Sequence, residues 1–373
     1  MSSDWCTIES DPAVLTELVE RFGVEEVQFT EVYEICDSSI ESIIKQYGNI
    51  YGLMFLFKYT DISHAQLSSI PIDTPAGMFY AHQVVNNACA TQAVLSILLN
   101  RLDINIGPHL KDLKDFTQSF DPNMCGLAIG NSDILRSAHN SFKPISSLEF
   151  DKETKGHKES DAFHYICYVP FRNAVYEIDG LASGVVLLGH VDNNSTINDD
   201  ANISTLYNSP ENWVPLAIKE IRRRVSLYNT DSHNEIRFSL MAIVPNALLR
   251  AKIQLSNLLK EKQRVILKLM SYGEDVDFDI IQEFEGEFEE DEILTSTTLA
   301  ELPNDIPSLK RLFESLRDKL TEIELTIRSE ELVRLKWREE NNRRRHDFFP
   351  FVLAMMKHAS KKGLLTKKFK QLM

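Results

Sequence analysis

The sequence changes character at Pro245. Before this residue, short apolar runs of strand length alternate with polar loops and with segments of helical spacing. After it, Leu and Ile recur at nearly heptad intervals over long stretches, which is the pattern of paired helices. This order predicts an α+β domain followed by an α-helical extension, and 373 residues are enough for two or three such parts.

The first part contains the strand signals. Its apolar runs are rich in aromatic or β-branched residues and are separated by turn residues such as Pro, Asn and Gly. The predicted strands cover residues 51–59, 163–169, 175–178, 185–188 and 236–244. Helical spacing follows the capping residues Ser10 and Asp11 and ends at Gly23, and it returns between residues 108 and 138.

The second part contains two sets of heptad-like positions, separated by a charged stretch. The sets are Leu248, Leu255, Leu259, Ile266 and Leu269, and then Leu309, Leu316, Leu320, Ile323 and Ile327. Between them, residues 273–292 hold eleven acidic residues and no Lys or Arg, which is typical of a solvated linker. Residues 331–373 reverse this sign, with twelve Lys and Arg against four Asp and Glu. This basic tail indicates either a docking module or a solvated helical face.

Charge and cysteine content exclude several classes of protein. The formal net charge of −15 argues against a general nucleic-acid binder, because binding to phosphates requires clustered Lys and Arg, so we expect protein partners. Five scattered cysteines without a C-x-x-C pair fit neither a disulfide framework nor a zinc site, and we expect no metal or cofactor. The sequence shows neither a signal peptide nor an uncharged apolar run of about 18 residues, so we expect a soluble intracellular protein that does not bind membranes.

Cys89 is the first candidate for chemistry. Asn86 or Asn87 is predicted to cap a helix that continues through an apolar run to Leu99. Cys89 would then lie in the first turn, where the positive end of the helix dipole favours a thiolate over a thiol. The alternative is a small buried hydrophobic side chain, which is the usual role of a free cysteine.

A cysteine nucleophile needs a base, and His164 is the histidine whose setting suits that role. It lies in the predicted strand at 163–169, where a histidine could also be a core residue with satisfied hydrogen bonds. Asp179 ends the next predicted strand, and a hairpin of the two strands would place its carboxylate beside the imidazole. That carboxylate would orient His164 and favour its protonated form, as a thiolate–imidazolium pair requires.

Gln83 completes the predicted site. It precedes Cys89 by six residues, so its side-chain amide can point at the same space as the backbone N–H of Cys89. Two such donors make an oxyanion hole for the intermediate of acyl transfer. The order Gln83, Cys89, His164 and Asp179 is the papain-like arrangement of a cysteine protease.

The motifs around these residues are joined by two others near the ends of the first part. The full set is Gln83-x-x-x-Asn87-Ala88-Cys89 with residues 163–165, 176–180, 5–12 and 235–244. Together they resemble the ubiquitin C-terminal hydrolase family of cysteine deubiquitinases, over residues 4–246. Ala90 is similar to the larger, tail-bearing members, because the shorter members have glycine after the nucleophile. The resemblance implies a papain-like fold with a central antiparallel sheet between helices and a knotted backbone, which is a rare topology.

The resemblance also implies the reaction and the partners. Cys89 would attack the carbonyl of ubiquitin's C-terminal glycine, and ubiquitin conjugates would be the substrates. In the tail, residues 342–351 are similar to the C-terminal helical domain of the proteasome-associated member, which docks on a ubiquitin-receptor subunit of the regulatory particle. The implied organisation is a catalytic domain at 4–246, a helical extension at 247–330 and a docking domain at 331–373, in a protein of the cytoplasm and nucleus.

Two polar stretches interrupt the first part. By resemblance, residues 151–161 correspond to the loop that crosses the active site in this family, and the length of that loop would limit the size of the leaving group. Residues 192–212 look like an addition to the common pattern.

Other functions fit the same residues. A related chromatin-associated deubiquitinase carries a similar tail behind a longer insert, for which this chain lacks room. A catalytically silent ubiquitin- or proteasome-binding scaffold is a second alternative, against which the presence of all four chemical residues argues. A papain-like amidase or transferase with another substrate is a third.

Overall fold

The structure, a computed structural model, describes residues 5–58, 71–143, 163–191, 210–229, 238–273 and 302–363. The chain divides into two compact units, one of residues 1–245 with 337–373 and the other of residues 246–336. The predicted loop at 151–161, residues 192–209 of the predicted insert and residues 274–292 of the acidic linker lie outside the described residues.

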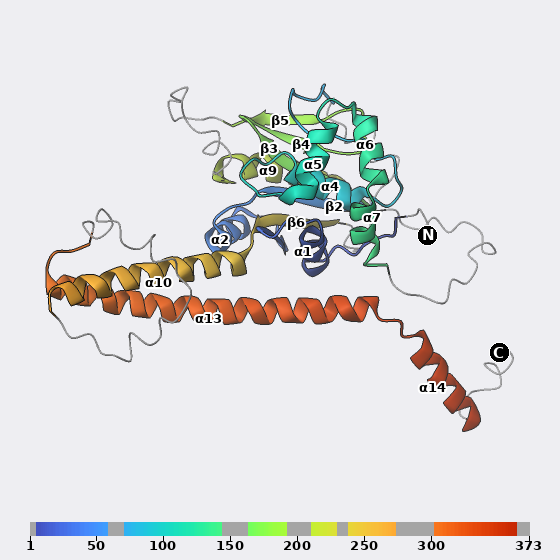
Figure 1. The fold of residues 1–373 in the computed structure, drawn as a ribbon. Coiled ribbons are helices and arrows are strands. Elements are labelled where there is room, and N and C mark those ends of the chain that lie inside the picture. The colour runs from blue at the N-terminus through green and yellow to red at the C-terminus, as the bar shows by residue number, and fades with distance from the viewer. Residues whose placement is uncertain are drawn as a thin grey trace. The chain divides into compact units, whose positions relative to one another are not determined.

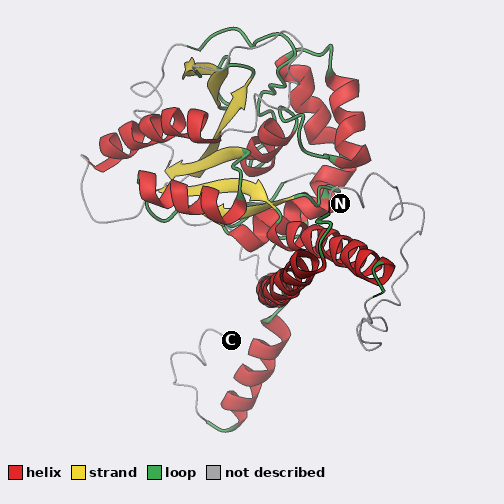
Figure 2. Ribbon diagram, turned by 90° about the vertical axis from the view of Figure 1, so that its left-hand side faces the viewer, coloured by secondary structure: helices red, strands yellow, loops and turns green. Residues whose placement is uncertain are grey.

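A six-stranded antiparallel sheet with the order β1-β6-β2-β3-β4-β5 forms the centre of the first unit. Its strands are β1 (Val27–Glu31), β2 (Gly52–Lys58), β3 (Phe163–Phe171), β4 (Ala174–Ile178), β5 (Val186–His190) and β6 (Phe238–Pro245). Helices lie on either side of this sheet (Figure 2). The predicted α+β fold with a central antiparallel sheet is therefore confirmed, and five of the six strands fall where the apolar runs predicted them.

The described helices of the first unit are mostly short (Figure 1). They are α1 (Pro12–Arg21), α2 (Asp37–Tyr47), α4 (Cys89–Leu98), α5 (Gly107–Thr117), α6 (Pro122–Asn131), α7 (Asp133–Asn140), α9 (Pro210–Asn229) and α14 (Phe349–Lys361). The helix predicted after Asp11 is α1, whose first-turn amides donate to the Asp11 carboxylate. The helical stretch at 108–138 is divided among α5, α6 and α7, because Asp121 with Pro122 and then Ser132 start new helices.

Three elements and one boundary differ from the predictions. Strand β1 and helix α2 were not predicted, and β1 is an edge strand of only five residues. Helix α9 was also not predicted, and its first turn includes the last three residues of the predicted insert at 192–212. The predicted C-terminal boundary of the insert, residue 212, was therefore too late in the chain. Prolines at 210 and 215 are typical of loops in a sequence, but here both lie within a helix.

Helix α4 is almost completely buried. Every residue from Ala90 to Leu98 is buried, so this helix is enclosed on all sides rather than amphipathic. It packs closely on the sheet at Gly52, where a Cβ atom would lie 2.5 Å from a side-chain carbon of Ile97. The position of the N-terminus of α4, and hence of Cys89, is fixed by this packing.

The described part of the second unit consists of two long helices, α10 (Ala247–Ser271) and the main part of α13 (Ile306–Arg345). The two helices share one apolar cluster, which confirms the predicted pairing. Its buried members are Ala251, Leu258, Val265, Leu269, Leu309, Leu316, Leu320 and Ile323. Helix α13 continues without a break through residue 330. Among the helices that the structure describes, none combines the length and apolar character needed to cross a membrane.

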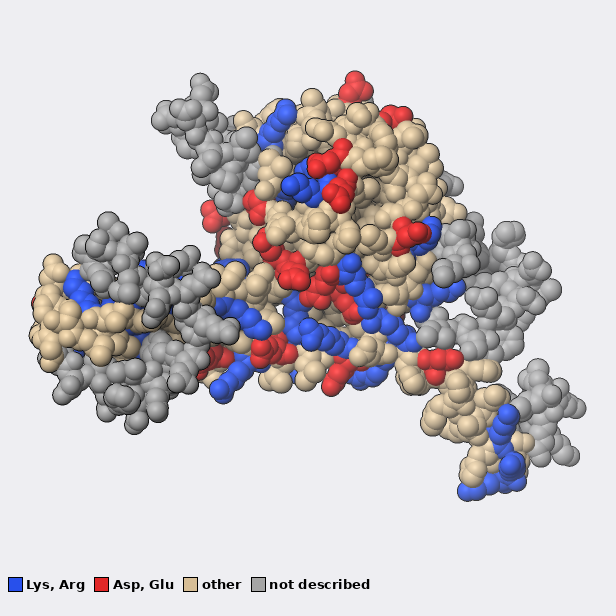
Figure 3. Space-filling view, viewed as in Figure 1, with Lys and Arg blue, Asp and Glu red and all other residues tan. Residues whose placement is uncertain are grey.

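The end of α13 belongs to the first unit and packs on α1. Asn341 is 1% exposed and donates to the Ala13 carbonyl (3.0 Å) and to the Glu17 carboxylate (2.7 Å). Arg344 forms ion pairs with Glu9 (2.9 Å) and with the α1 capping residue Asp11 (2.8 Å). On the face seen in Figure 3, basic and acidic side chains lie next to one another along the long helices rather than in patches of one sign.

Candidate active site

Cys89 is the first residue of α4 and so lies in the first turn, as predicted, but the predicted cap is wrong. The N-cap residue is Ala88, and no side chain caps this helix. Asn87 instead adopts a left-handed conformation with φ 65°, which asparagine tolerates better than most residues, and its side chain donates to the Trp5 carbonyl at 3.0 Å. A contact with the distant N-terminal segment therefore replaces the local cap, and the turn before Cys89 is held from outside the helix.

The N-terminal segment is also tied to α4 through His139, which is fully buried. The ring of Trp5 packs on that of His139 at 4.7 Å between centroids. Nε2 of His139 lies 2.6 Å from the Cys6 carbonyl oxygen, and Nδ1 lies 2.8 Å from the Thr91 hydroxyl. Because a carbonyl only accepts, Nε2 carries the proton and Nδ1 accepts from Thr91. Burial lowers the pKa of His139, in keeping with this neutral form.

His164 and Asp179 lie together, as the hairpin of β3 and β4 predicted. Nε2 of His164 is 2.6 Å from Oδ1 of Asp179, and both residues are buried. The same carboxylate oxygen accepts from the backbone N–H of Leu181 at 2.8 Å, which holds it in place. The imidazole lies nearly perpendicular to the ring of Phe57 on the neighbouring strand β2, with 5.9 Å between ring centroids. These contacts fix the plane of the imidazole.

The charge state of His164 follows from its neighbours. Burial acts to lower its pKa, but hydrogen bonds to Asp179 and then to Cys89 outweigh burial and raise the pKa to about 9. At neutral pH the imidazole is therefore protonated. The structure brings Cys89, His164 and Asp179 together in the order that a thiolate–imidazolium pair with an orienting carboxylate requires.

Gln83 lies next to the turn that follows Asp179. Its backbone N–H donates to the Gly180 carbonyl at 2.8 Å, and its side-chain amide donates to the Val85 carbonyl at 3.2 Å. An amide nitrogen has two N–H groups, so the second can donate to a developing oxyanion. The role of Gln83 beside the Cys89 backbone N–H stays a prediction.

Tyr80 is a residue near the site that the sequence did not predict. Its hydroxyl lies within hydrogen-bond distance of the carbonyl oxygens of Asp179 (3.1 Å) and Ala182 (2.6 Å). The preceding residue, Phe79, is held through its N–H and its carbonyl by the side chain of Asn100 (2.7 and 2.8 Å). The segment that leads to Gln83 is thus attached to both the Asp179 turn and the residues after α4.

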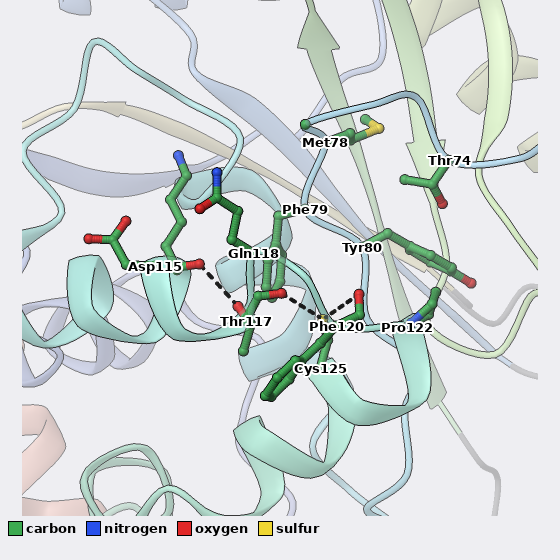
Figure 4. A pocket seen from close by; sticks show the side chains of 12 residues that line it. Thr74, Met78, Phe79, Tyr80, Asp115, Thr117, Gln118, Phe120, Pro122 and Cys125 are labelled. Carbon is green, nitrogen blue, oxygen red and sulfur yellow. Dashed lines mark hydrogen bonds between the residues drawn. The ribbon is translucent and has the colours of Figure 1, made fainter.

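A pocket of about 230 Å³ borders the same segment (Figure 4). Residues from the segment, from the end of α5 and from the start of α6 line it, among them Met78, Phe79, Tyr80, Thr117, Phe120 and Cys125. Cys125 is buried, and its thiol hydrogen-bonds to the carbonyls of Thr117 and Phe120 (3.7 and 3.9 Å). None of the four predicted site residues lines this pocket. The hydrogen-bond partners that the structure gives this thiol are backbone carbonyls, so the candidate chemistry stays at Cys89.

The donor set fits acyl transfer by a cysteine. It offers a thiol at a helix N-terminus, a protonated imidazole, an orienting carboxylate and amide donors. Within the described ranges, no group of three or more His, Cys, Asp or Glu side chains is arranged to hold a metal ion.

Comparisons with known protein families match both parts of the chain. The family model described as "Ubiquitin carboxyl-terminal hydrolase, family 1" matches residues 5–207. A second, described as "Ubiquitin carboxyl-terminal hydrolases", matches residues 320–365.

Curated relatives match over most of the chain. Ubiquitin carboxyl-terminal hydrolase isozyme L5 of Dictyostelium discoideum is 35% identical over 361 residues, which are 97% of this chain and 93% of that protein. Ubiquitin carboxyl-terminal hydrolase ubh-4 of Caenorhabditis elegans is 29% identical, covering 98% of this chain and 90% of that protein. Ubiquitin carboxyl-terminal hydrolase BAP1 of Gallus gallus is 34% identical over 71% of this chain but only 37% of its own length.

One solved structure extends the similarity to the fold. The crystal structure of Trichinella spiralis UCH37 bound to ubiquitin vinyl methyl ester superposes with a TM-score of 0.52 at 30% identity. The superposition covers 69% of this chain and 89% of that one.

Proposed function

This chain belongs to the ubiquitin carboxyl-terminal hydrolase family, and from that premise we propose the residues with which it acts and the place where it acts. It is a deubiquitinase of the cysteine type. Cys89, His164, Asp179 and Gln83 are its catalytic residues, and the proteasome regulatory particle is its site of action. The contact of His164 with Asp179 at 2.6 Å, joined by the hydrogen bond of His164 with Cys89, is the observation that supports the site most strongly.

The proposed mechanism follows from the chemistry of these groups. The Cys89 thiolate attacks the carbonyl carbon of ubiquitin's C-terminal glycine, and the oxyanion accepts hydrogen bonds from the Gln83 amide and the Cys89 N–H. His164 donates its proton to the leaving amine, and the C–N bond breaks to leave a thioester on Cys89. His164 then takes a proton from water, which attacks the thioester and releases ubiquitin with a free carboxylate.

A fluorogenic amide on the C-terminus of ubiquitin tests the substrate. The full chain should release the fluorophore from ubiquitin at least about tenfold more efficiently than from a short peptide with the same C-terminal sequence, because contacts remote from the bond contribute to catalysis. Equal cleavage of the two substrates would instead support a general papain-like amidase. Failure to cleave either one would support the non-catalytic scaffold.

The proposed place of action rests on the tail. The second family model matches residues 320–365, and the chain spans nearly the full length of the isozyme L5 relative but little more than a third of BAP1. Arg344 and Arg345 at the end of α13 are paired with Asp11 and Glu17 of the α1 region, so they are poor candidates for a docking surface. Helix α14 has no buried residue, and its exposed Phe351 (64%) and Met355 (56%) lie one turn apart. We therefore propose that α14 contributes apolar anchors to the proteasomal ubiquitin receptor, in the cytoplasm and nucleus.

Paired substitutions in α14 test this docking. The double variant Phe351→Glu with Met355→Glu should lose most co-purification with the regulatory particle, because it places charge in an apolar interface, while hydrolysis of fluorogenic ubiquitin stays within about twofold. Leu325→Glu is the matched control, since Leu325 is equally exposed (60%) but lies on α13. Unchanged recovery of the particle with the α14 variant would contradict the proposal. Capture of a chromatin-remodelling complex instead would favour the chromatin-associated alternative.

A further inference from the structure

Gln92 is a buried polar residue of α4 for which the proposed mechanism has no use. It is 5% exposed and lies three residues after Cys89, on the same side of the helix. Its side-chain amide nitrogen donates to the carbonyl oxygen of Ala81, two residues before Gln83. Ala81 is itself fully buried, so water does not compete for this carbonyl. Gln92 thus connects the helix of the nucleophile to the segment of the proposed oxyanion donor.

Gly180, in the turn after Asp179, packs against the side chain of Gln92 and against Gln83. Its carbonyl oxygen accepts the backbone N–H of Gln83 at 2.8 Å. A Cβ atom added at Gly180 would overlap the amide nitrogen of Gln92, and it would lie 2.9 Å from Cδ of Gln92 and 3.2 Å from Cβ of Gln83. The side chain of Gln92 therefore fills the space between α4, the Gln83 segment and the Asp179 turn, and glycine is required beside it.

We propose that Gln92 is a positioning residue that sets the place of the Gln83 amide relative to the Cys89 backbone N–H. The inference rests on the proposed role of Gln83 in the oxyanion hole. The segment before Gln83 is held by two side-chain amides, that of Gln92 on α4, which binds Ala81, and that of Asn100 just after α4, which binds Phe79. Asn100 anchors the far end of the segment. Gln92 anchors the end that reaches the site, where a small shift changes the geometry around the oxyanion.

The substitution Gln92→Met tests this role, because methionine keeps the volume and loses the donor. We expect kcat on fluorogenic ubiquitin to fall by about 10- to 100-fold and KM to stay within about twofold, since the oxyanion forms only in the transition state. Alkylation of Cys89 by iodoacetamide, followed by mass spectrometry, should stay within about twofold, because displacement at a saturated carbon creates no oxyanion. Leu95→Met, a buried change on the same helix, should leave both rates unchanged.

Gln83→Ala separates this inference from the proposed function. It should show the same split between turnover and alkylation, with a loss of about 100- to 1,000-fold in kcat. A normal kcat in Gln92→Met together with an impaired Gln83→Ala would overturn the positioning role alone. A normal kcat in Gln83→Ala would overturn both it and the oxyanion assignment. Parallel losses of turnover and alkylation in Gln92→Met would reduce Gln92 to a general structural residue.

A double-mutant cycle with Gly180→Ala gives an independent test. Gly180→Ala displaces the Gln92 amide and should lower kcat while sparing alkylation. In a Gln92→Ala background the overlap with Gln92 is gone and only the 3.2 Å approach to Cβ of Gln83 remains, so Gly180→Ala should lower kcat much less than it does when Gln92 is present. Full additivity of the two losses would overturn the inference.

Discussion

Replacing Cys89 by alanine is expected to abolish hydrolysis of ubiquitin conjugates, with a loss of about 10⁴- to 10⁶-fold in kcat. Without the thiol, no thioester forms, and only binding and the amide donors remain to assist water. The same variant should form no covalent adduct with a ubiquitin that carries a C-terminal electrophile. Intact mass spectrometry of the protein after incubation with that probe measures the adduct directly.

Cys36 provides the matched control for this experiment. Like Cys89, it is a partly exposed cysteine at the start of a helix, and hydrogen bonds from Ser38 and then Ser39 lower the pKa of its thiol. Its partners in the structure are serines and Glu34 rather than a histidine. Cys36→Ala should therefore react with the probe as the unmodified chain does. An adduct that persists in Cys89→Ala, or that disappears in Cys36→Ala, would show that the nucleophile has been misassigned.

The contrast between these cysteines shows why Cys89 could be chosen from the sequence as the candidate nucleophile. Helix ends and strand ends are local features, so the start of α4 and the end of β4 were readable from residue order. The hairpin then brought Asp179 to His164 without any further information. The prediction that an asparagine caps α4 failed because the side chain of Asn87 donates to the carbonyl of Trp5, 82 positions away. A contact of that range outweighs a local capping preference and leaves no periodic trace in the sequence.

The predictions for α9 and for the end of α13 failed for other reasons. Helix α9 does carry helical apolar spacing, at Trp213, Val214, Ala217, Ile218 and Ile221, all of them buried. An internal proline and three successive arginines masked that signal. The arginines at the end of α13 were predicted as part of a docking tail, yet Arg344 pairs with Glu9 and Asp11. The sign of a charged run can be read from the sequence. Its ion-pair partners cannot, because those of Arg344 lie more than 300 residues away.

Replacing Asp179 by asparagine is expected to change the pH dependence of the reaction as well as its rate. Asparagine keeps the shape of the side chain but removes the negative charge that helps to raise the pKa of His164 to about 9. The pKa of His164 should fall toward its ordinary value, so the thiolate–imidazolium pair is lost at lower pH. We expect kcat at pH 7 to fall by up to about 10⁴-fold, the loss seen when the equivalent aspartate of a serine protease is replaced.

The direction in which the alkaline limb of the pH profile moves shows whether the charge of Asp179 raises the pKa of His164. A histidine whose pKa is raised in the folded enzyme stays charged until the pH passes about 9, so the alkaline limb of kcat/KM lies near that pH in the unmodified chain. In Asp179→Asn this limb should move to lower pH, measured as turnover of fluorogenic ubiquitin between pH 5 and 10. Asp121→Asn is the control, because Asp121 caps α6 and asparagine caps equally well. If the limb stays at its original pH in Asp179→Asn, the charge on His164 has another source, and the carboxylate serves only to orient the ring.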